Sequence, residues 1–210
     1  MAKVAWKAGT MLAPLPPALI SCGTLQKPNA MTAAWSGIIC TEPTLVYVSI
    51  RPSRFSNELI RKSGEFVINV PTVEMAKAVD FCGVKSGRDI DKFKQTGLIA
   101  AKSSVVSAPQ VEQSPISLEC KVKEIKSFGT HDMFLAEVVA VDIDEKYLDK
   151  SSALRLDKAG LLAYAHGFYY ALGRKIGKFG WSVEKKSTKR KRAARAQIKG
   201  IPNKKVKYGK

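Results

Sequence analysis

The sequence predicts a mainly β fold, a closed or partly closed antiparallel β-barrel with short helices. At least six apolar or β-branched runs of strand length recur along the chain, and the helical segments between them are short. No Gly-x-Gly-x-x-Gly turn follows any of these runs. A doubly wound parallel sheet would need longer helices between its strands, so that fold class is not expected.

Four runs in the first half of the chain are predicted strands. The clearest is 44–50, Thr-Leu-Val-Tyr-Val-Ser-Ile, because β-branched and aromatic side chains favour an extended backbone. Pro52 ends this strand, since proline has no N–H to donate to a ladder. The other three runs have the same character: 18–24, 32–40 and 65–70.

Two short helices are expected between these strands. One covers 53–62, with Ser53 as its N-cap and Gly64 as its stop. The other covers 72–82 and carries the same two signals, Thr72 and Gly83.

A long hairpin is predicted in the second half. Residues 84–115 form a connection rich in glycine, proline and serine, and 116–123 then alternates strictly between apolar and polar residues, as a half-exposed strand does. The alternation slips at 124–125, where we expect a β-bulge. The apolar run 133–143 returns beside the first strand, which places His131 at the tip.

Charge is distributed unevenly along the 210 residues. The net charge is +17, but 185–210 hold twelve basic residues and no acidic one, which leaves 23 basic against 18 acidic residues in 1–184. We therefore expect one domain over 1–184 and a disordered basic tail over 185–210. The tail is either a solubilising extension or a contact for nucleic acid or an acidic partner.

Cysteine usage and hydropathy exclude several classes of protein. The four cysteines are widely spaced, so free thiols in a reducing compartment are expected and a zinc or iron–sulfur site is not supported. No apolar run is long enough to cross a bilayer, and the N-terminal residues lack the continuous apolar stretch of a secretion signal. A cytoplasmic protein is expected. No nucleophile–base pair supports a hydrolase.

Small side chains crowd around one tryptophan in 27–37, Lys-Pro-Asn-Ala-Met-Thr-Ala-Ala-Trp-Ser-Gly. Ala33 and Ala34 would let the backbone approach a flat ligand, with Trp35 beside it. The simpler alternative is a hairpin whose tryptophan fills the core. Two polar residues flank the small ones, Asn29 and Thr32.

Polar side chains that follow the strand 44–50 suit a phosphate. Arg51 and Arg54 offer guanidinium groups at a helix N-terminus, a combination that binds phosphate well. Hydroxyls accompany them, on Ser53 and Ser56. An exposed basic turn is the alternative interpretation.

Further candidates lie later in the chain. Lys92, in the long connection, is able to neutralise a phosphate or an anionic ring. His131 is either a turn residue or a group that hydrogen-bonds a ligand or donates a proton. Aromatic residues near the end of the domain suit a wall around a flat ligand or a dimer contact: Tyr164, His166, Phe168, Tyr169 and Tyr170.

The order of six motifs resembles the flavoredoxin branch of the flavin reductase-like family. The resemblance covers roughly residues 10–182 and excludes the basic tail. The motifs are N-A-M-T-A-A-W (29–35), S-I-R-P-S-R-F-S (49–56), E-F-V-I-N-V-P (65–71), S-G-R-D-I-D-K-F (86–93), G-T-H-D-M-F-L-A-E-V (129–138) and L-G-R-K-I-G-K-F-G (172–180).

This resemblance implies an FMN-binding split β-barrel that works as a homodimer, with the flavin near the subunit interface. It implies that the isoalloxazine and ribityl chain are lined by Asn29, Thr32, Ala33, Ala34 and Trp35. It assigns the phosphate end to Arg51, Arg54 and Ser56. Further flavin contacts are implied for Lys92, His131 and Tyr164.

The expected function is that of a redox flavoprotein using FMN, with His131 as its catalytic residue. Hydride from NAD(P)H and electrons from a protein donor are alternative inputs. A different class of function is a non-enzymatic binding protein that its basic tail tethers to nucleic acid or an acidic partner.

Overall fold

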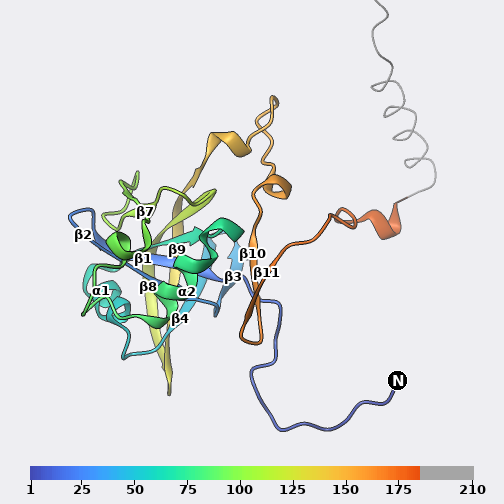
Figure 1. Ribbon diagram of the computed structural model, residues 1–210, viewed down its shortest axis with the longest axis horizontal. Coiled ribbons are helices and arrows are strands. Elements are labelled where there is room, and N and C mark those ends of the chain that lie inside the picture. The colour runs from blue at the N-terminus through green and yellow to red at the C-terminus, as the bar shows by residue number, and fades with distance from the viewer. Residues whose placement is uncertain (185–210) are drawn as a thin grey trace, which may run out of the picture. The chain divides into compact units, whose positions relative to one another are not determined.

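A computed structural model describes residues 1–184, and its main feature is a seven-stranded antiparallel sheet in the order β2-β1-β5-β8-β9-β4-β3 (Figure 1). The two edge strands, β2 and β3, follow each other in the chain with only Ala34 and Trp35 between them. The sheet therefore rolls until its edges approach without pairing, which is the partly closed barrel that the sequence predicts. The strands are β1 Ala18–Thr24, β2 Lys27–Ala33, β3 Ser36–Thr41, β4 Thr44–Ile50, β5 Glu65–Val70, β8 Ile116–Phe128 and β9 His131–Ile143.

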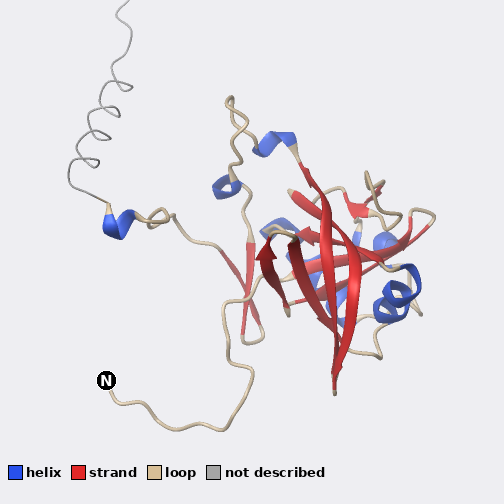
Figure 2. Ribbon diagram, turned by 180° about the vertical axis from the view of Figure 1, so that it is seen from behind, coloured by secondary structure: helices blue, strands red, loops and turns tan. Residues whose placement is uncertain are grey.

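Helices are few and short beside the strands (Figure 2). The α-helices are α1 Phe55–Ser63, α2 Ala76–Val84 and α3 Lys92–Thr96. Two small hairpins stand apart from the main sheet: β6 Ala100–Ala101 with β7 Gln110–Val111, and β10 Leu162–Ala165 with β11 Phe168–Ala171. Single turns of 3₁₀ helix are η1 Val73–Met75, η2 Glu145–Tyr147, η3 Leu156–Lys158 and η4 Trp181–Val183.

Alternating residues of β1 enter two different hydrophobic clusters. Ile20 belongs to the barrel interior with Phe66 and Phe134, and all three side chains are fully buried. Leu19 faces the other way, into a second cluster with Val79 of α2 and Phe93 of α3. Successive residues of a strand point to opposite faces, so β1 is buried on both and its sequence is a continuous apolar run.

The predicted single strand over 32–40 is divided in the structure: 32–33 end β2, 36–40 belong to β3, and Ala34 and Trp35 lie between them. Residues 27–33 pair with β1 along their length, from Lys27 opposite Thr24 to Ala33 opposite Ala18, and the chain then leaves the ladder before β3 begins. Strand β2 thus begins five residues before the predicted strand and contains most of the small-residue stretch. Trp35 keeps 38% of its surface exposed, so it does not fill the core.

Helix ends follow the predictions only in part. Gly64 ends α1 in the left-handed region, at φ 70°, as predicted. Ser53 does not cap this helix: Arg54 is the N-cap residue, and no side chain caps it. Thr72 precedes η1 without a side-chain cap, and α2 continues through Gly83 to Val84.

The β8–β9 hairpin is confirmed, and its second bulge lies just before the predicted position 124–125. Pairing runs from Ile116 opposite Ile143 to Phe128 opposite His131, with register shifts between Glu119 and Cys120 and between Val122 and Glu124. Gly129, at φ 62°, makes the turn at the tip. His131 therefore begins β9 directly beside the turn.

A layer of buried polar groups pins the connection that contains β6 and β7 to the sheet. Asn69 of β5 accepts hydrogen bonds from the Val111 amide at 2.8 Å and the Ser117 hydroxyl at 2.9 Å, and it donates to the Ser21 hydroxyl at 2.8 Å. Ser21 in turn donates to the Pro109 carbonyl. These bonds satisfy polar groups that would be costly to bury alone.

Glu119 of β8 holds the same connection at a second point. Its carboxylate accepts hydrogen bonds from the Ser104 amide and hydroxyl and from the amides of Val105 and Val106, at 2.6–2.8 Å. Burial by itself would raise the pKa of Glu119, but these donors outweigh it and hold the pKa at about 2. Glu119 is therefore ionised, and both of its carboxylate oxygens accept hydrogen bonds that hold this connection against β8.

The chain divides into two compact units, Met1–Leu172 and one that starts at Gly173. The predicted basic tail lies outside the described residues.

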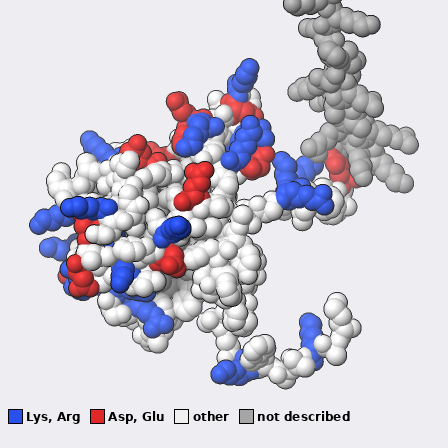
Figure 3. Space-filling model, viewed as in Figure 1, with Lys and Arg blue, Asp and Glu red and all other residues white. Residues whose placement is uncertain are grey.

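Over 1–184, no helix is long and apolar enough to span a membrane, and no three metal-ligating side chains converge. The four cysteines are free thiols, three of them buried. Figure 3 shows basic and acidic side chains mixed over one face, in line with the near balance of charge in 1–184.

We predict that Glu119→Gln destabilises the fold by roughly 2 kcal/mol, because an amide NH₂ is unable to accept from the backbone N–H groups that now bind a carboxylate oxygen. Urea unfolding at pH 7 measures the free energy. Glu137→Gln is the matched control, since Glu137 is a partly exposed β9 residue paired with Lys123 and should lose less than about 0.5 kcal/mol. Equal stability of the two variants would contradict the anchoring role.

Candidate functional site

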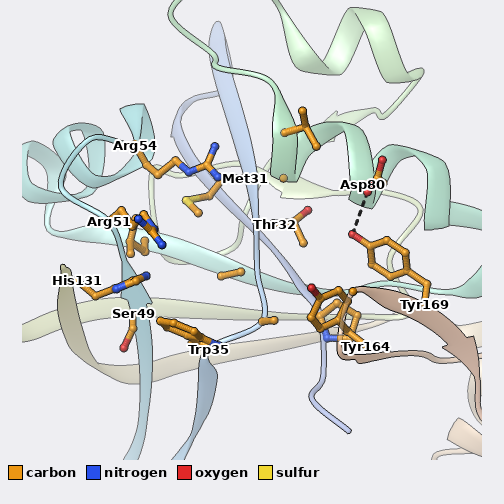
Figure 4. Close-up of a pocket in the computed structure, with 17 residues that line it drawn as sticks. Met31, Thr32, Trp35, Ser49, Arg51, Arg54, Asp80, His131, Tyr164 and Tyr169 are labelled. Atoms are coloured by element: carbon orange, nitrogen blue, oxygen red, sulfur yellow. Dashed lines mark hydrogen bonds between the residues drawn. The ribbon is translucent and has the colours of Figure 1, made fainter. Parts of the chain in front are cut away.

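A cavity of about 440 Å³ lies where the ends of β2 and β4, the start of β9, helix α2 and the β10–β11 hairpin meet (Figure 4). Figure 4 shows Arg51, Arg54 and His131 on one side of it, and Tyr164, Tyr169 and Asp80 on the other. The rolling of the sheet brings these elements together, because β2 and β4 lie far apart in the strand order. The volume is typical of a small-molecule site.

Trp35 and His131 form one wall of this cavity. Their ring centroids are 4.5 Å apart with an interplanar angle of 45°. The Trp35 carbonyl accepts a hydrogen bond from the Ser49 amide of β4 at 2.8 Å, which fixes the backbone that carries the indole. The tryptophan therefore belongs to the rim of a cavity, where its ring is available to a flat ligand.

His131 is held in its neutral form. Burial and the positive charge of Arg51 lower the pKa of His131, while the carboxylate of Asp132 opposes them. Thr130 Oγ1 lies 2.9 Å from His131 Nδ1. A neutral imidazole so placed offers one donor and one acceptor at neutral pH.

A smaller cavity of about 140 Å³ shares Met31 and Arg54 with the larger one. It is lined by cations and hydroxyls: Ser53, Arg54, Ser56, Lys85, Ser86 and Lys92. The uncapped N-terminus of α1 enters it through Phe55 and Ser56. First-turn amides, hydroxyls and cations together form a favourable seat for a phosphate.

Lys92 is buried, with 4% of its surface exposed. Its ammonium donates to the carbonyls of Ala30, at 2.7 Å, and Cys82, at 2.9 Å, which leaves one N–H for the smaller cavity. Burial, with a contribution from the charge of Arg54, lowers the pKa of Lys92. An anion in that cavity would therefore meet a desolvated cation with a free donor.

Asn29 has an unsatisfied acceptor at the same place. It is 5% exposed and donates to the Ser56 hydroxyl at 2.8 Å, but its Oδ1 has no hydrogen-bond partner. Only glycine fits opposite it, because a Cβ on Gly87 would lie 2.0 Å from this oxygen. Since Asn29 Nδ2 binds the lone pair of Ser56 Oγ, the Ser56 O–H remains available as a donor.

Small residues form the floor of the larger cavity. Ala33 and Ala34 line the larger cavity at the point where β2 leaves the ladder. Thr32 also lines it, but its hydroxyl donates to the Val79 carbonyl of α2. Gly83 of α2 lies opposite Thr32, where an added Cβ would be 3.4 Å from the Thr32 Cβ.

The opposite wall includes residues that the sequence motifs did not single out. Asp80 and Val84 of α2 line the cavity, and Asp80 accepts a hydrogen bond from the Tyr169 hydroxyl at 3.4 Å. The rings of Tyr164 and Tyr169 are 5.5 Å apart. A sequence signal for Asp80 was weak, because a polar residue on a short helix usually faces solvent.

Most of the predicted site residues come together. The larger cavity receives Thr32, Ala33, Ala34, Trp35, Arg51, Arg54, His131 and Tyr164. The smaller one receives Arg54, Ser56 and Lys92. Asn29 lines neither cavity, but its side-chain amide donates a hydrogen bond to the Ser56 hydroxyl.

Comparisons with known proteins agree with this geometry. The family model of the flavin reductase like domain matches residues 11–173 of this chain. The flavoredoxin of Desulfovibrio vulgaris (Miyazaki F) superposes with a TM-score of 0.81 at 29% identity, over 87% of this chain and 100% of that chain. An FMN-binding protein from Thermus thermophilus gives a TM-score of 0.69 at 26% identity, over 85% and 97%. A protein of Archaeoglobus fulgidus is 36% identical over 66% of this chain and 77% of its own length.

Proposed function

The chain belongs to the flavin reductase-like family and has its split-barrel fold, and we propose on this basis that it is a redox protein that binds FMN. One observation carries the proposal. A basic, hydroxyl-lined cavity opens from a larger one walled by alanines and aromatic rings, so that a phosphate seat and a flat-ring site lie side by side.

The phosphate end is assigned to the smaller cavity. Arg54 presents a guanidinium group, Ser56 an unused O–H and Lys92 its third N–H. A dianionic phosphate would compensate the desolvated Lys92, whose burial has no carboxylate partner among its hydrogen bonds.

The ring end is assigned to the larger cavity. Ala33 and Ala34 permit close approach of the backbone to a planar ring, and Trp35, His131 and Tyr164 border it. Bound FMN would supply the electron-transfer chemistry, and the protein would supply position and electrostatics. His131, kept neutral, would hold or release a proton at its ring nitrogen beside the flavin.

The electron input has two versions. Either NAD(P)H donates hydride directly, or a redox protein donates electrons. The larger cavity is an open one bounded by the exposed Trp35, which supports access of a second planar molecule as well as of a partner protein.

We propose further that the protein is a homodimer. β3 is an edge strand, and it exposes Ile38 by 75% and Ile39 by 51%. Exposed apolar side chains on an unpaired edge favour association with another copy. Since β3 begins next to Trp35, a second copy on this edge would border the flavin cavity.

Arg54→Gln is expected to weaken FMN binding by about tenfold to a hundredfold and to change riboflavin binding by less than about threefold, because only FMN carries the phosphate. Flavin fluorescence quenching on titration of both ligands measures the two affinities. Arg155→Gln is the matched control, since Arg155 pairs with Asp157 outside both cavities. An equal loss of affinity for FMN and riboflavin would show that Arg54 does not contact the phosphate. Wild-type protein that binds neither flavin would reject the proposed function.

Steady-state oxidation of NADH and NADPH by FMN-loaded protein separates the two electron inputs. Turnover with an added electron acceptor would establish direct hydride donation. Loaded protein without turnover on either nucleotide excludes the reductase version and leaves the protein-donor version.

Ile38→Lys is expected to shift the protein from dimer to monomer, because a charge at the centre of an apolar interface is costly to desolvate. Light scattering after size exclusion gives the mass. Ile99→Lys, at an equally apolar and 51% exposed site outside β3, should leave the dimer intact. Wild-type protein that is monomeric at micromolar concentration would remove the dimer proposal.

A further inference from the structure

A third cavity, of about 540 Å³, lies at the open end of the β8–β9 hairpin and shares no lining residue with the two cavities of the proposed flavin site. Ser117 of β8 and Asp142 of β9 face each other across the ladder in its wall. The segment after β7 contributes Glu112 and Ser114, and the chain after β9 closes the cavity with Asp144 and Lys146.

Two polar atoms in this wall are buried without a hydrogen-bond partner, Ser114 Oγ and Asp142 Oδ2. Ser114 is only 6% exposed, and it lines the cavity. Unpaired buried polar atoms are rare in folded proteins, and both of these can accept a hydrogen bond, so together they point to a ligand that supplies donors.

The other polar groups of the cavity are already engaged. The Ser117 hydroxyl donates to Asn69 Oδ1 at 2.9 Å, and the Gln113 amide bonds the Gly97 carbonyl and the Ile99 amide. The Lys146 ammonium lies 2.5 Å from Asp144 Oδ2. The only cation of the lining is therefore committed to a carboxylate and does not serve Asp142.

Asp142 can hydrogen-bond the Glu119 carboxylate only while it keeps its own proton; once Asp142 is ionised, its Oδ2 is left without a partner. The neighbouring carboxylate of Glu119 is filled by four hydrogen bonds from Ser104, Val105 and Val106. Two ionised carboxylates repel each other, so Asp142 gains most from a group that is both positively charged and a donor.

We propose that this cavity binds a small organic cation with N–H donors, a primary ammonium or a guanidinium group, which donates to Asp142 Oδ2 and Ser114 Oγ. The cavity has three carboxylates, on Glu112, Asp142 and Asp144, against one ammonium, so its charge favours such a ligand. No trio of metal-ligating side chains forms in 1–184, so a bare metal ion fits less well.

Binding should depend on pH in one direction. Burial, together with the hydrogen bond and negative charge of Glu119, raises the pKa of Asp142 to about 6. The charged groups around Asp142 are Glu119 on β8, Glu112 after β7, and Asp144 and Lys146 after β9. Below pH 6 a protonated Asp142 no longer attracts a cation, so affinity falls as the pH is lowered from 7.5 to 5.

Calorimetric titration of the full-length, FMN-loaded chain with agmatine at pH 7.5 tests the proposal. Agmatine carries both a guanidinium and a primary ammonium group, whereas choline, the comparison ligand, carries a positive charge without N–H donors. We expect agmatine to bind at least tenfold more tightly than choline. Equal binding of the two, or no binding of agmatine at millimolar concentration, would overturn the proposal.

Two variants locate the site. Asp142→Asn should weaken agmatine about tenfold or more and remove the pH dependence, and Ser114→Ala should weaken it several-fold. Asp89→Asn, at an exposed carboxylate outside the cavity, is the matched control. Unchanged affinity in Asp142→Asn, with unfolding as cooperative as wild type, would reject the site. Flavin absorbance of each variant is the independent readout for the flavin cavity, which lies apart.

Discussion

The long ladder between β8 and β9 joins the two halves of the sheet: β5, β1 and β2 continue from β8, and β4 and β3 continue from β9. Without it the halves would share no strand pairing. The bulges within this ladder bend and twist both strands, and the roll that results carries β2 towards β4. The larger cavity exists because of that roll, since its walls come from both halves.

Polar groups buried against the sheet help to decide where the long connection lies. Asn69 and Glu119 together bind the segment around β6 and β7 through backbone amides, and buried apolar residues of the segment pack beside them, among them Val106 and Ala108. A buried polar network is stable only when every member is satisfied. Asp142 and Ser114, at the edge of this network, are the members left without partners.

The two ends of the β8–β9 hairpin differ in charge. The tip, at His131, faces Arg51 and adjoins the cavity that holds Arg54 and borders Lys92. The open end presents carboxylates on both sides of Asp142. The hairpin thus borders the larger cavity at its tip, through His131, and a proposed cation-binding site at its base, so the two sites can be tested separately.

Local patterns in the sequence determined the strands at 18–24, 44–50 and 65–70, the end of α1 at Gly64 and the bulged hairpin, because period-two alternation and glycine conformations are properties of short segments. Ordered motifs determined the family. Only the tertiary structure decided that 27–33 is an edge strand, that Trp35 packs at a tilt against His131 outside the core, and that Asn29 meets Gly87. Those outcomes depend on contacts between segments far apart in the chain, and the sheet had to roll before any of them formed.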